Sequence, residues 1–227
     1  MNNYIVAAIG HWNKDIFEEK SETLDGNWHF VSTPEDLTAT LNSNIIPTYI
    51  FFFHWRWIVP KHITQNYECV CFHMTDVPYG RGGSPLQNLI VRGHKDTVLT
   101  ALQMEEGVDT GPVYLKKSLK LNGTASEIYK RTSLLSWEMA GKIILNSIVP
   151  QKQKGPVTEF RRRKPEDSEI PENLSLEKIY DYIRMLDAED YPRAFIQKHG
   201  YKLEFENAHL KENKLVAKVS IKIKKDS

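Results

Sequence analysis

Short apolar runs alternate with helix-like stretches over Met1–Pro150, and this alternation constrains the fold more than any other feature of the chain. Most of these runs lack the polar alternation of a half-exposed strand, which is typical of central parallel strands that are covered on both faces. The pattern predicts an α/β fold with a doubly wound, mostly parallel sheet. The expected strands are Tyr4–Ile9, Trp28–Ser32, Thr48–Phe53, Tyr67–Phe72, Val98–Met104 and Val113–Leu119.

Helix signals fall between these runs. Thr33 is followed by Pro34 and Asp36, which predicts an N-cap and a helix to about Leu41. Thr124 and Glu127 form a T-x-x-E capping box before a long helix to about Val149. The other expected helices are Lys14–Ser21, a short one beginning at Pro60, and Pro85–Gly93.

The character of the chain changes after Pro150. Gln151–Pro171 is polar, basic and proline-containing, with one short strand expected at Val157–Phe160. An amphipathic helix at Leu176–Leu186 and a hairpin of Tyr201–Glu206 with Lys214–Lys222 should follow. We therefore expect a main domain over residues 1–150, and a linker with a small C-terminal subdomain over 151–227. The exposed edge strand of the hairpin allows pairing between subunits in a homodimer.

Charge and cysteine content narrow the class of protein. The 227 residues include 30 Lys and Arg against 29 Asp and Glu, whereas a protein that holds nucleic acid by its phosphates is usually basic. Cys69 and Cys71 lie in an apolar run and are expected to be buried free thiols in a reducing compartment. The N-terminal apolar run lacks a charged n-region and is too short to span a bilayer. These features predict a cytoplasmic protein without a nucleic-acid or membrane partner.

Two side chains at the carboxyl ends of expected strands are candidates for chemistry, because ligands of open α/β sheets bind there. His73 follows an apolar run and precedes the loop PYGRGGSP, where glycines allow the backbone to approach a ligand. An imidazole can both accept and donate a proton near neutral pH. Asp109 follows a later strand and could orient that imidazole. The alternatives are a loop histidine bonded to nearby backbone and a turn aspartate.

Other motifs are absent or ambiguous. No G-x-G-x-x-G follows the first strand, no P-loop or metal-spaced cluster occurs, and Ser84 does not stand in G-x-S-x-G. The tryptophan-rich segment His54–Trp57 either packs in the core and rim or lines a pocket for a flat ring. The basic run Arg161–Pro165 is either solvated or clamps phosphates.

These residues together resemble the formyltransferases that depend on N10-formyltetrahydrofolate. The family pattern of a histidine, a proline, an Arg-Gly loop and an Asp-Thr-Gly is matched in order by His73, Pro78, Arg81-Gly82 and Asp109-Thr110-Gly111, and the spacing from His73 to Asp109 is that of the family. The segment ending in Ile58-Val59-Pro60 is similar to the one that wraps the pterin of the folate. The resemblance implies a Rossmann-like formyltransferase fold with a small C-terminal helix-plus-hairpin annex, and catalysis by His73 and Asp109.

The resemblance also implies two sets of binding residues. Around the pterin of N10-formyltetrahydrofolate it puts His54, Trp55, Arg56, Trp57, Ile58, Glu105, Gly107 and Val108. Around the substrate it puts Thr75, Asp76, Tyr79, Arg81, Gly82, Gly83, Arg161, Arg162, Tyr191 and Arg193. One departure stands out: the family's catalytic asparagine falls at Cys71, and a thiol is a weak hydrogen-bond donor.

The predicted size of the C-terminal annex indicates which class of substrate to expect. One helix and one hairpin are too short for the barrel domain that helps methionyl-tRNA formyltransferases hold tRNA. We therefore expect a small-molecule amine, a nucleotide-linked 4-amino-dideoxy sugar of the UDP-linked, pseudaminic-acid type. The alternatives are a methionyl-tRNA or carrier-bound aminoacyl formyltransferase, a folate-binding homologue weakened by Cys71, and a glycinamide ribonucleotide transformylase.

Overall fold

The computed structural model of the protein describes residues 1–223, and these form two compact units. The first unit contains Met1–Gly82, Thr97–Leu119 and Tyr129–Glu159. The second contains Gly83–Asp96, Lys120–Ile128 and the described residues from Phe160 onward. Each unit is therefore assembled from stretches that are distant in sequence.

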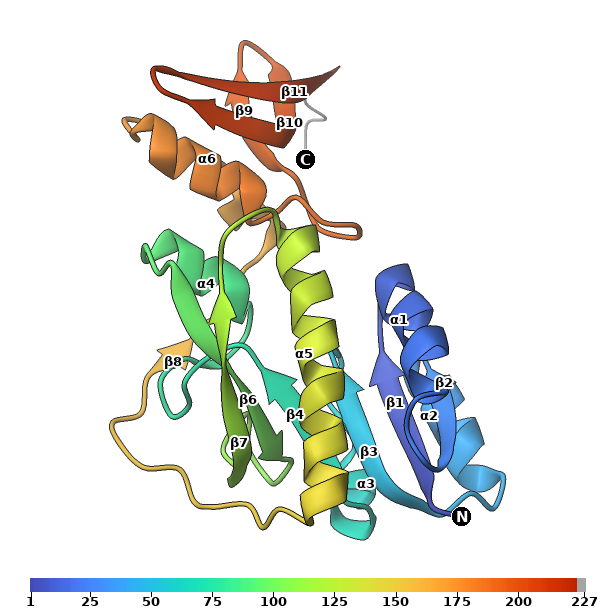
Figure 1. Cartoon of the computed structure of the whole chain (residues 1–227). Helices are drawn as coiled ribbons and strands as arrows, with labels where there is room; N and C mark the ends of the chain where they lie inside the picture. Colours follow the sequence, from blue (N-terminus) through green and yellow to red (C-terminus); the bar gives the residue numbers. More distant parts are fainter. Residues whose placement is uncertain (224–227) are drawn as a thin grey trace. The chain divides into compact units, whose positions relative to one another are not determined.

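A six-stranded sheet forms the first unit, with the order β2-β1-β3-β4-β6-β7 (Figure 1). β1 pairs in parallel with β2 and β3, and β3 with β4, whereas β6 runs antiparallel to β4. The mostly parallel, doubly wound sheet predicted from the sequence is therefore confirmed. The strands are β1 (Asn3–Ala8), β2 (Asn27–Val31), β3 (Pro47–Phe53), β4 (Cys69–His73), β6 (Asp96–Gln103) and β7 (Val113–Lys120).

Both faces of this sheet are covered, which explains the continuous apolar character of its central strands. On one face Trp137 of α5 (Ala125–Asn146) lies 5.9 Å from Phe17 of α1 (His11–Ser21) and 5.5 Å from Phe53, between ring centroids. On the other face α2 (Pro34–Asn42) and α3 (Lys61–Asn66) contribute Leu37 and Ile63 to a buried cluster with residues of β1 and β3.

Local signals in the sequence set several helix ends. The Thr33 hydroxyl accepts a hydrogen bond from the Asp36 N–H at 3.0 Å, so the predicted N-cap of α2 is confirmed. The predicted capping box is also present, since the Thr124 N–H donates to Glu127 Oε2 at 2.7 Å. The start expected for this first helix, Lys14, is wrong: α1 begins at His11, directly after Gly10, whose φ of 85° suits glycine.

The second unit combines helices with a small antiparallel sheet. It contains α4 (Pro85–Val91), the 3₁₀ turn η1 (Pro165–Ser168), α6 (Leu176–Arg184), β9 (Ala194–Lys198), β10 (Tyr201–Lys211) and β11 (Lys214–Ile223). The strands pair in the order β11-β10-β9 (Figure 1). A buried ion pair anchors α6: Arg184 Nε donates to Asp181 Oδ1 at 2.7 Å, while its Nη1 donates to the carbonyls of Leu121 and Gly123.

The C-terminal annex is larger than the sequence predicted. The expected hairpin is present as β10 and β11, but β9 adds a third strand through pairing of Ala194 with Phe205 and Lys198 with Tyr201. Two short strands, β5 (Arg81–Gly82) and β8 (Glu159–Phe160), form a further small ladder. Of these two, only β8 was predicted, within the longer Val157–Phe160.

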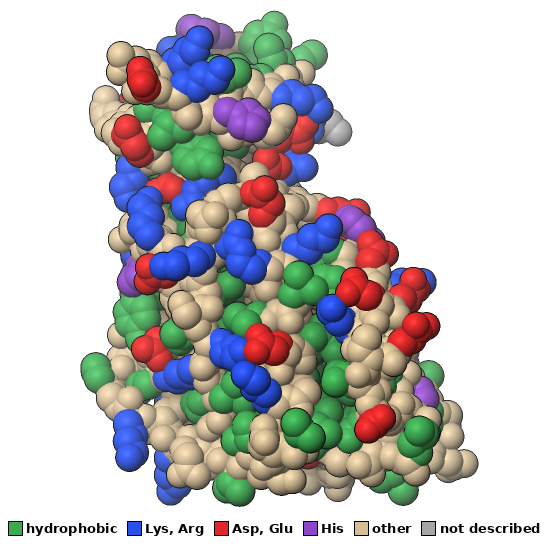
Figure 2. All heavy atoms as spheres, in the orientation of Figure 1, with side chains coloured by type: hydrophobic (Ala, Val, Ile, Leu, Met, Phe, Trp, Pro, Cys, Tyr) green, Lys and Arg blue, Asp and Glu red, His purple; other side chains and the backbone are tan. Residues whose placement is uncertain are grey.

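Charged side chains of both signs are interspersed over the face of the molecule that Figure 2 displays, in keeping with a formal net charge of +1. Among residues 1–223, no helix has the length and apolar character that a membrane span requires.

Candidate active site

His73 and Asp109 meet at the end of the central sheet. His73 is the last residue of β4, and Asp109 lies in the loop after β6. The Nδ1 atom of His73 is 3.4 Å from Oδ2 of Asp109, and the two side chains are only 9% and 14% exposed. A nearly buried imidazole therefore faces a nearly buried carboxylate.

The loop after β4 contacts both members of this pair. His73 Nε2 is 2.8 Å from the carbonyl oxygen of Gly80, and the Gly82 N–H donates to Asp109 Oδ2 at 2.9 Å. A carbonyl oxygen only accepts, so Nε2 carries a proton in this geometry. Since Nδ1 faces a carboxylate, the imidazolium form of His73 satisfies both ring nitrogens.

Backbone geometry explains the Asp-Thr-Gly sequence. Asp109 has a φ of 54°, a conformation that aspartate tolerates better than most residues. The Thr110 hydroxyl donates to the Glu106 carbonyl at 2.9 Å and closes the turn. A Cβ atom on Gly111 would lie 1.9 Å from the carbonyl oxygen of Gln103, so this position admits only glycine without rearrangement. The loop is thereby folded back against the end of β6.

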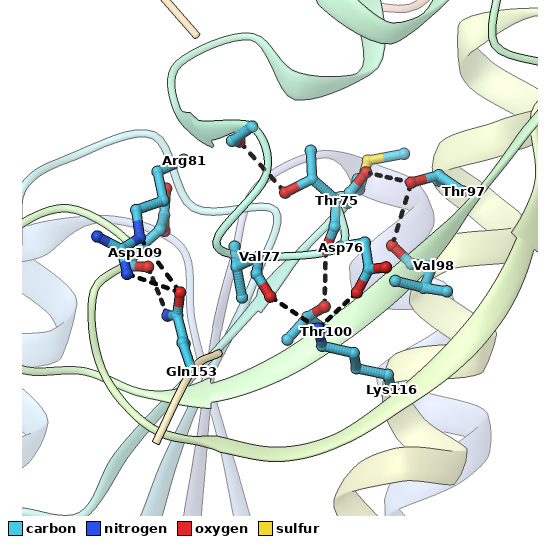
Figure 3. Close-up of polar contacts among 12 residues, drawn as sticks. Thr75, Asp76, Val77, Arg81, Thr97, Val98, Thr100, Asp109, Lys116 and Gln153 are labelled. Atoms are coloured by element: carbon cyan, nitrogen blue, oxygen red, sulfur yellow. Dashed lines mark hydrogen bonds and ion pairs between the residues drawn. The ribbon is translucent and has the colours of Figure 1, made fainter. Parts of the chain in front are cut away.

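Polar side chains of β6 and β7 hold the loop that follows His73 (Figure 3). The Thr100 hydroxyl donates to the Thr75 carbonyl at 2.7 Å, and the Thr75 hydroxyl donates to the Gly80 carbonyl at 3.2 Å. Lys116 Nζ donates to the carbonyl of Val77 at 2.7 Å and forms an ion pair with Asp76. Thr75 is completely buried and Asp76 is exposed. Thr75, which was predicted to bind substrate, thus uses its hydroxyl and its carbonyl to hold the loop in place.

Cys71 lies two residues before His73 in β4, so the two side chains point to the same face of the sheet. Burial raises the pKa of its thiol well above the usual value, and the negative charge of Asp109 raises it further. The thiol therefore stays protonated at neutral pH. It can offer only a weak S–H donor at the position where the resemblance implies an asparagine amide.

The tryptophan-rich segment follows β3. His54 has a φ of 51° and packs its ring 4.2 Å from that of Tyr129, and burial with the charge of Arg56 lowers the pKa of His54 to about 4. Trp55 packs on the apolar cluster beneath the sheet and lies 4.8 Å from Trp57 between ring centroids. The packing interpretation of this segment therefore holds for Trp55, while Trp57 remains 38% and Ile58 83% exposed.

The loop after β6 approaches this segment. Met104 packs on the same apolar cluster as Trp55 and Cys71. An ion pair of 3.2 Å joins Lys61, at the start of α3, to Glu106. Glu105, Gly107 and Val108 are exposed, and Val108 keeps 55% of its accessible surface. Trp55 and Met104 thus pack on one apolar cluster, and the predicted pterin-binding residues of the second loop follow Met104 directly.

The remaining predicted substrate residues divide between the units. Tyr79, Arg81 and Gly82 belong to the first unit. The second unit contains Gly83, Arg161, Arg162, Tyr191 and Arg193.

Several of these residues have partners within their own unit. A Cβ atom on Gly83 would lie 2.5 Å from Cβ and 2.6 Å from Cα of Arg162, so Gly83 has no room for a side chain. Arg161 pairs with Asp167 at 2.6 Å, and Arg193 pairs with Asp187 at 2.6 Å and Glu206 at 3.3 Å. Their assignment to substrate binding stays a prediction.

Sequence reasoning missed one residue that contacts the site. Gln153, in the segment after α5, donates to the carbonyls of Asp109 and Gly111 and accepts from Arg81 (Figure 3). A lone glutamine in a polar segment carries no period or motif that would have identified it. No group of three or more potential metal ligands was found within residues 1–223.

Comparisons with known proteins point to one family. The family model described as "Methionyl-tRNA formyltransferase, C-terminal domain" matches residues 165–222. The chain is 29% identical over 146 residues to the methionyl-tRNA formyltransferase of Thermodesulfovibrio yellowstonii, covering 61% of this chain and 47% of that protein. It is 28% identical over 184 residues to that of Campylobacter curvus, covering 79% and 60%. The chain thus spans about half the length of the curated relatives it matches.

Solved structures agree. A methionyl-tRNA formyltransferase from Clostridium thermocellum matches with a TM-score of 0.95 and 46% identity, over 99% of this chain and 100% of that one. A 4-N formyltransferase from Francisella tularensis has a TM-score of 0.66 at 16% identity, over 99% of each chain. HypX from Aquifex aeolicus in complex with tetrahydrofolic acid has a TM-score of 0.73 at 16% identity, over 92% of this chain and 38% of that one. The last two similarities concern the fold alone.

Proposed function

This chain belongs to the formyltransferase family, and we propose that it transfers a formyl group from N10-formyltetrahydrofolate to a primary amine. Membership rests on the full-length match to the Clostridium thermocellum structure. The observation that carries the activity is the distance of 3.4 Å between His73 Nδ1 and Asp109 Oδ2 at the carboxyl end of the sheet. Two adjacent titratable groups with little exposure are what proton transfer during acyl transfer requires.

The residues after β3 and β6 suit a flat, partly apolar ring system such as a reduced pterin. Three large apolar residues are exposed there: Trp57 by 38%, Ile58 by 83% and Val108 by 55%. Aromatic side chains stack well on planar rings, and burial of such surface favours binding. Trp57 and Arg56, whose guanidinium lies 5.5 Å from the Trp57 ring, would then contact the pterin.

N10-formyltetrahydrofolate supplies an electrophilic formyl carbon, whose oxygen gains negative charge as the amine adds. His73 lies between Asp109 and the Gly80 carbonyl, and it would stabilise that charge once its ring becomes an imidazolium. Asp109 would keep the ring oriented through Nδ1 and favour its charged form, so that Nδ1 can take the proton given up by the amine. His73 would then give this proton to N10, the leaving nitrogen, as the bond between the formyl carbon and N10 breaks. Gly82 fixes the carboxylate through its N–H.

Cys71 sets a limit on this chemistry. Its protonated thiol is a weak donor, so the imidazolium of His73 and backbone N–H groups would have to stabilise the oxyanion without a side-chain amide. We therefore expect slower turnover than in a relative with asparagine at this position.

For the acceptor amine, the comparisons favour the aminoacyl group of methionyl-tRNA over the amino sugar expected from the sequence. Two findings support this preference: residues 165–222 match the C-terminal domain model of methionyl-tRNA formyltransferases, and the 46% identical structure carries that name. The expectation of a small-molecule amine rested on an annex of one helix and one hairpin and on the near-zero net charge. The second unit in fact contains three paired strands and the arginine-rich segment after β8.

A product-mass assay tests both the reaction and the acceptor. The protein is incubated with N10-formyltetrahydrofolate and either methionyl-tRNA or one of a panel of UDP-, dTDP- and GDP-linked amino sugars. We expect a mass gain of one formyl group on methionyl-tRNA, with binding that weakens as salt rises because phosphates are contacted. A formylated sugar would replace the acceptor assignment only. Tetrahydrofolate binding without any product would indicate a folate-binding homologue.

A further inference from the structure

The side-chain amide of Gln153 uses its full hydrogen-bonding capacity in the first unit. Nε2 donates to the carbonyl oxygens of Asp109 and Gly111, both at 2.8 Å. Oε1 accepts from Nε and Nη2 of Arg81, at 3.2 and 2.8 Å. A primary amide offers two N–H donors and two lone pairs, and all four are occupied here. Figure 3 shows the side chain of Gln153 pointing toward Arg81 and Asp109.

These bonds join the two loops that flank the His73 ring. Arg81 stands between Gly80, whose carbonyl accepts from His73 Nε2, and Gly82, whose N–H donates to Asp109 Oδ2. Asp109 itself has a φ of 54°, so its backbone needs external support to hold the carboxylate in one direction. Gln153 supplies that support on the carbonyl side of Asp109.

We propose that Gln153 is a positioning residue, which holds the Asp109 carboxylate against His73 and is itself held by Arg81. This inference rests on the proposed function. Gln153 acts through Asp109, since its amide bonds the Asp109 backbone and the Arg81 side chain. Arg81 accordingly serves the geometry of the site, in addition to any role in binding substrate.

The chemistry of the amide is specific. A glutamate at position 153 would keep the acceptor for Arg81, but it would present a carboxylate to two carbonyl oxygens and lose both donated bonds. An alanine would lose the donated bonds and leave the Arg81 guanidinium without this acceptor. If holding Asp109 is what matters, Gln153→Glu and Gln153→Ala should be impaired alike.

The test compares kcat and KM of the full chain in the formyl-transfer assay. We expect kcat of Gln153→Ala and Gln153→Glu to fall by about 10- to 100-fold, since displacement of a group in a reactive site by about 1 Å has effects of that size. KM for both substrates should change by less than about threefold. The matched control is Gln151→Ala, because Gln151 is exposed, lies in the same segment, and donates to Val149 at 3.3 Å. It should retain wild-type kcat.

A double-mutant cycle separates positioning from general support of the fold. In an Asp109→Asn background, adding Gln153→Ala should lower kcat by less than about threefold, because the carboxylate that Gln153 positions is already gone. An undiminished effect of Gln153→Ala in that background would overturn the proposal, as would wild-type kcat in both Gln153 variants.

A readout without turnover keeps this inference distinct from the proposed function. NMR of the His73 ring should show resonances that move in Gln153→Ala in the direction seen in Asp109→Asn, and that stay in place in Gln151→Ala. Wild-type protein that formylates no acceptor would refute the proposed function and leave this measurement valid. Unmoved His73 resonances in a folded Gln153→Ala protein would overturn the positioning role. If Gln153→Ala does not fold, Gln153→Glu, which keeps an acceptor for Arg81, takes its place.

Discussion

Removing the charge of Asp109 without changing its shape should separate electrostatics from structure at the active site. Asparagine tolerates the φ of 54° at this position, and its amide oxygen can still accept from the Gly82 N–H. Asp109→Asn therefore removes mainly the negative charge beside His73. Two unit charges 3.4 Å apart attract by about 5 kcal/mol at an effective dielectric of 20 and by about 1 kcal/mol in bulk water.

The exposures of 9% and 14% put the pair between these limits, and we take about 3 kcal/mol. If the charged imidazolium forms only in the transition state, kcat should fall by about 100-fold, at about 1.4 kcal/mol per factor of ten. Initial rates of formyl transfer at saturating substrates measure this, with the thermal unfolding midpoint as a control for folding. A folded variant with kcat within about threefold of wild type would refute the role assigned to Asp109.

Three further outcomes follow from local geometry. Gly111→Ala should lower the free energy of unfolding by roughly 2 kcal/mol, because its Cβ would lie 1.9 Å from the Gln103 carbonyl oxygen. Gly141 lies in α5, where an added Cβ would make only ordinary contacts, so Gly141→Ala should raise the same free energy slightly in a denaturant titration. The pKa of His54 is lowered to about 4, so the native state resists protonation of this ring. The contribution of His54 to the free energy of unfolding should be full above about pH 6.5 and fall by at most about 3 kcal/mol toward pH 4. Denaturant titrations over this pH range should show that His54→Asn loses the dependence. Cys71→Asn should raise kcat by about tenfold or more over wild type, since one oxyanion donor is worth about 100-fold or more elsewhere, and equal rates in Cys71→Asn and Cys71→Ala would contradict this.

Much of the central sheet could be predicted because its signals are local and mutually consistent. The apolar runs of β1, β3 and β4 are continuous, and both faces of the sheet are covered as such runs require. The strand β9 was missed because Ala194–Lys198 is five residues long and its partner lies in β10, beyond a turn. Its strand character comes from that pairing, and its own sequence gives no clear alternation. Missing it led to the underestimate of the C-terminal annex.

The candidate site divides in the same way. His73 and Asp109 could be predicted because each stands at or after the end of an apolar strand and both match a spaced pattern. Gln153 could not, since its bonds reach residues 44 and 42 positions earlier in the chain, and they are made to backbone atoms. Backbone acceptors leave no trace in the identity of the residues that carry them. The supporting hydroxyl of Thr100, which bonds the Thr75 carbonyl, escaped prediction for the same reason.

The Asp-Thr-Gly sequence shows why a short motif can be informative here. Thr110 closes the turn, Gly111 is required by the approach of the Gln103 carbonyl, and the φ of Asp109 favours a small polar residue. Each of these demands could be met by a turn aspartate that has no chemical role. What distinguishes Asp109 is the direction of its carboxylate, which accepts from the Gly82 N–H in another loop and faces His73. A turn needs neither of these contacts. The backbone conformation explains why an aspartate fits at position 109, whereas the contacts with Gly82 and His73 explain why a carboxylate is present.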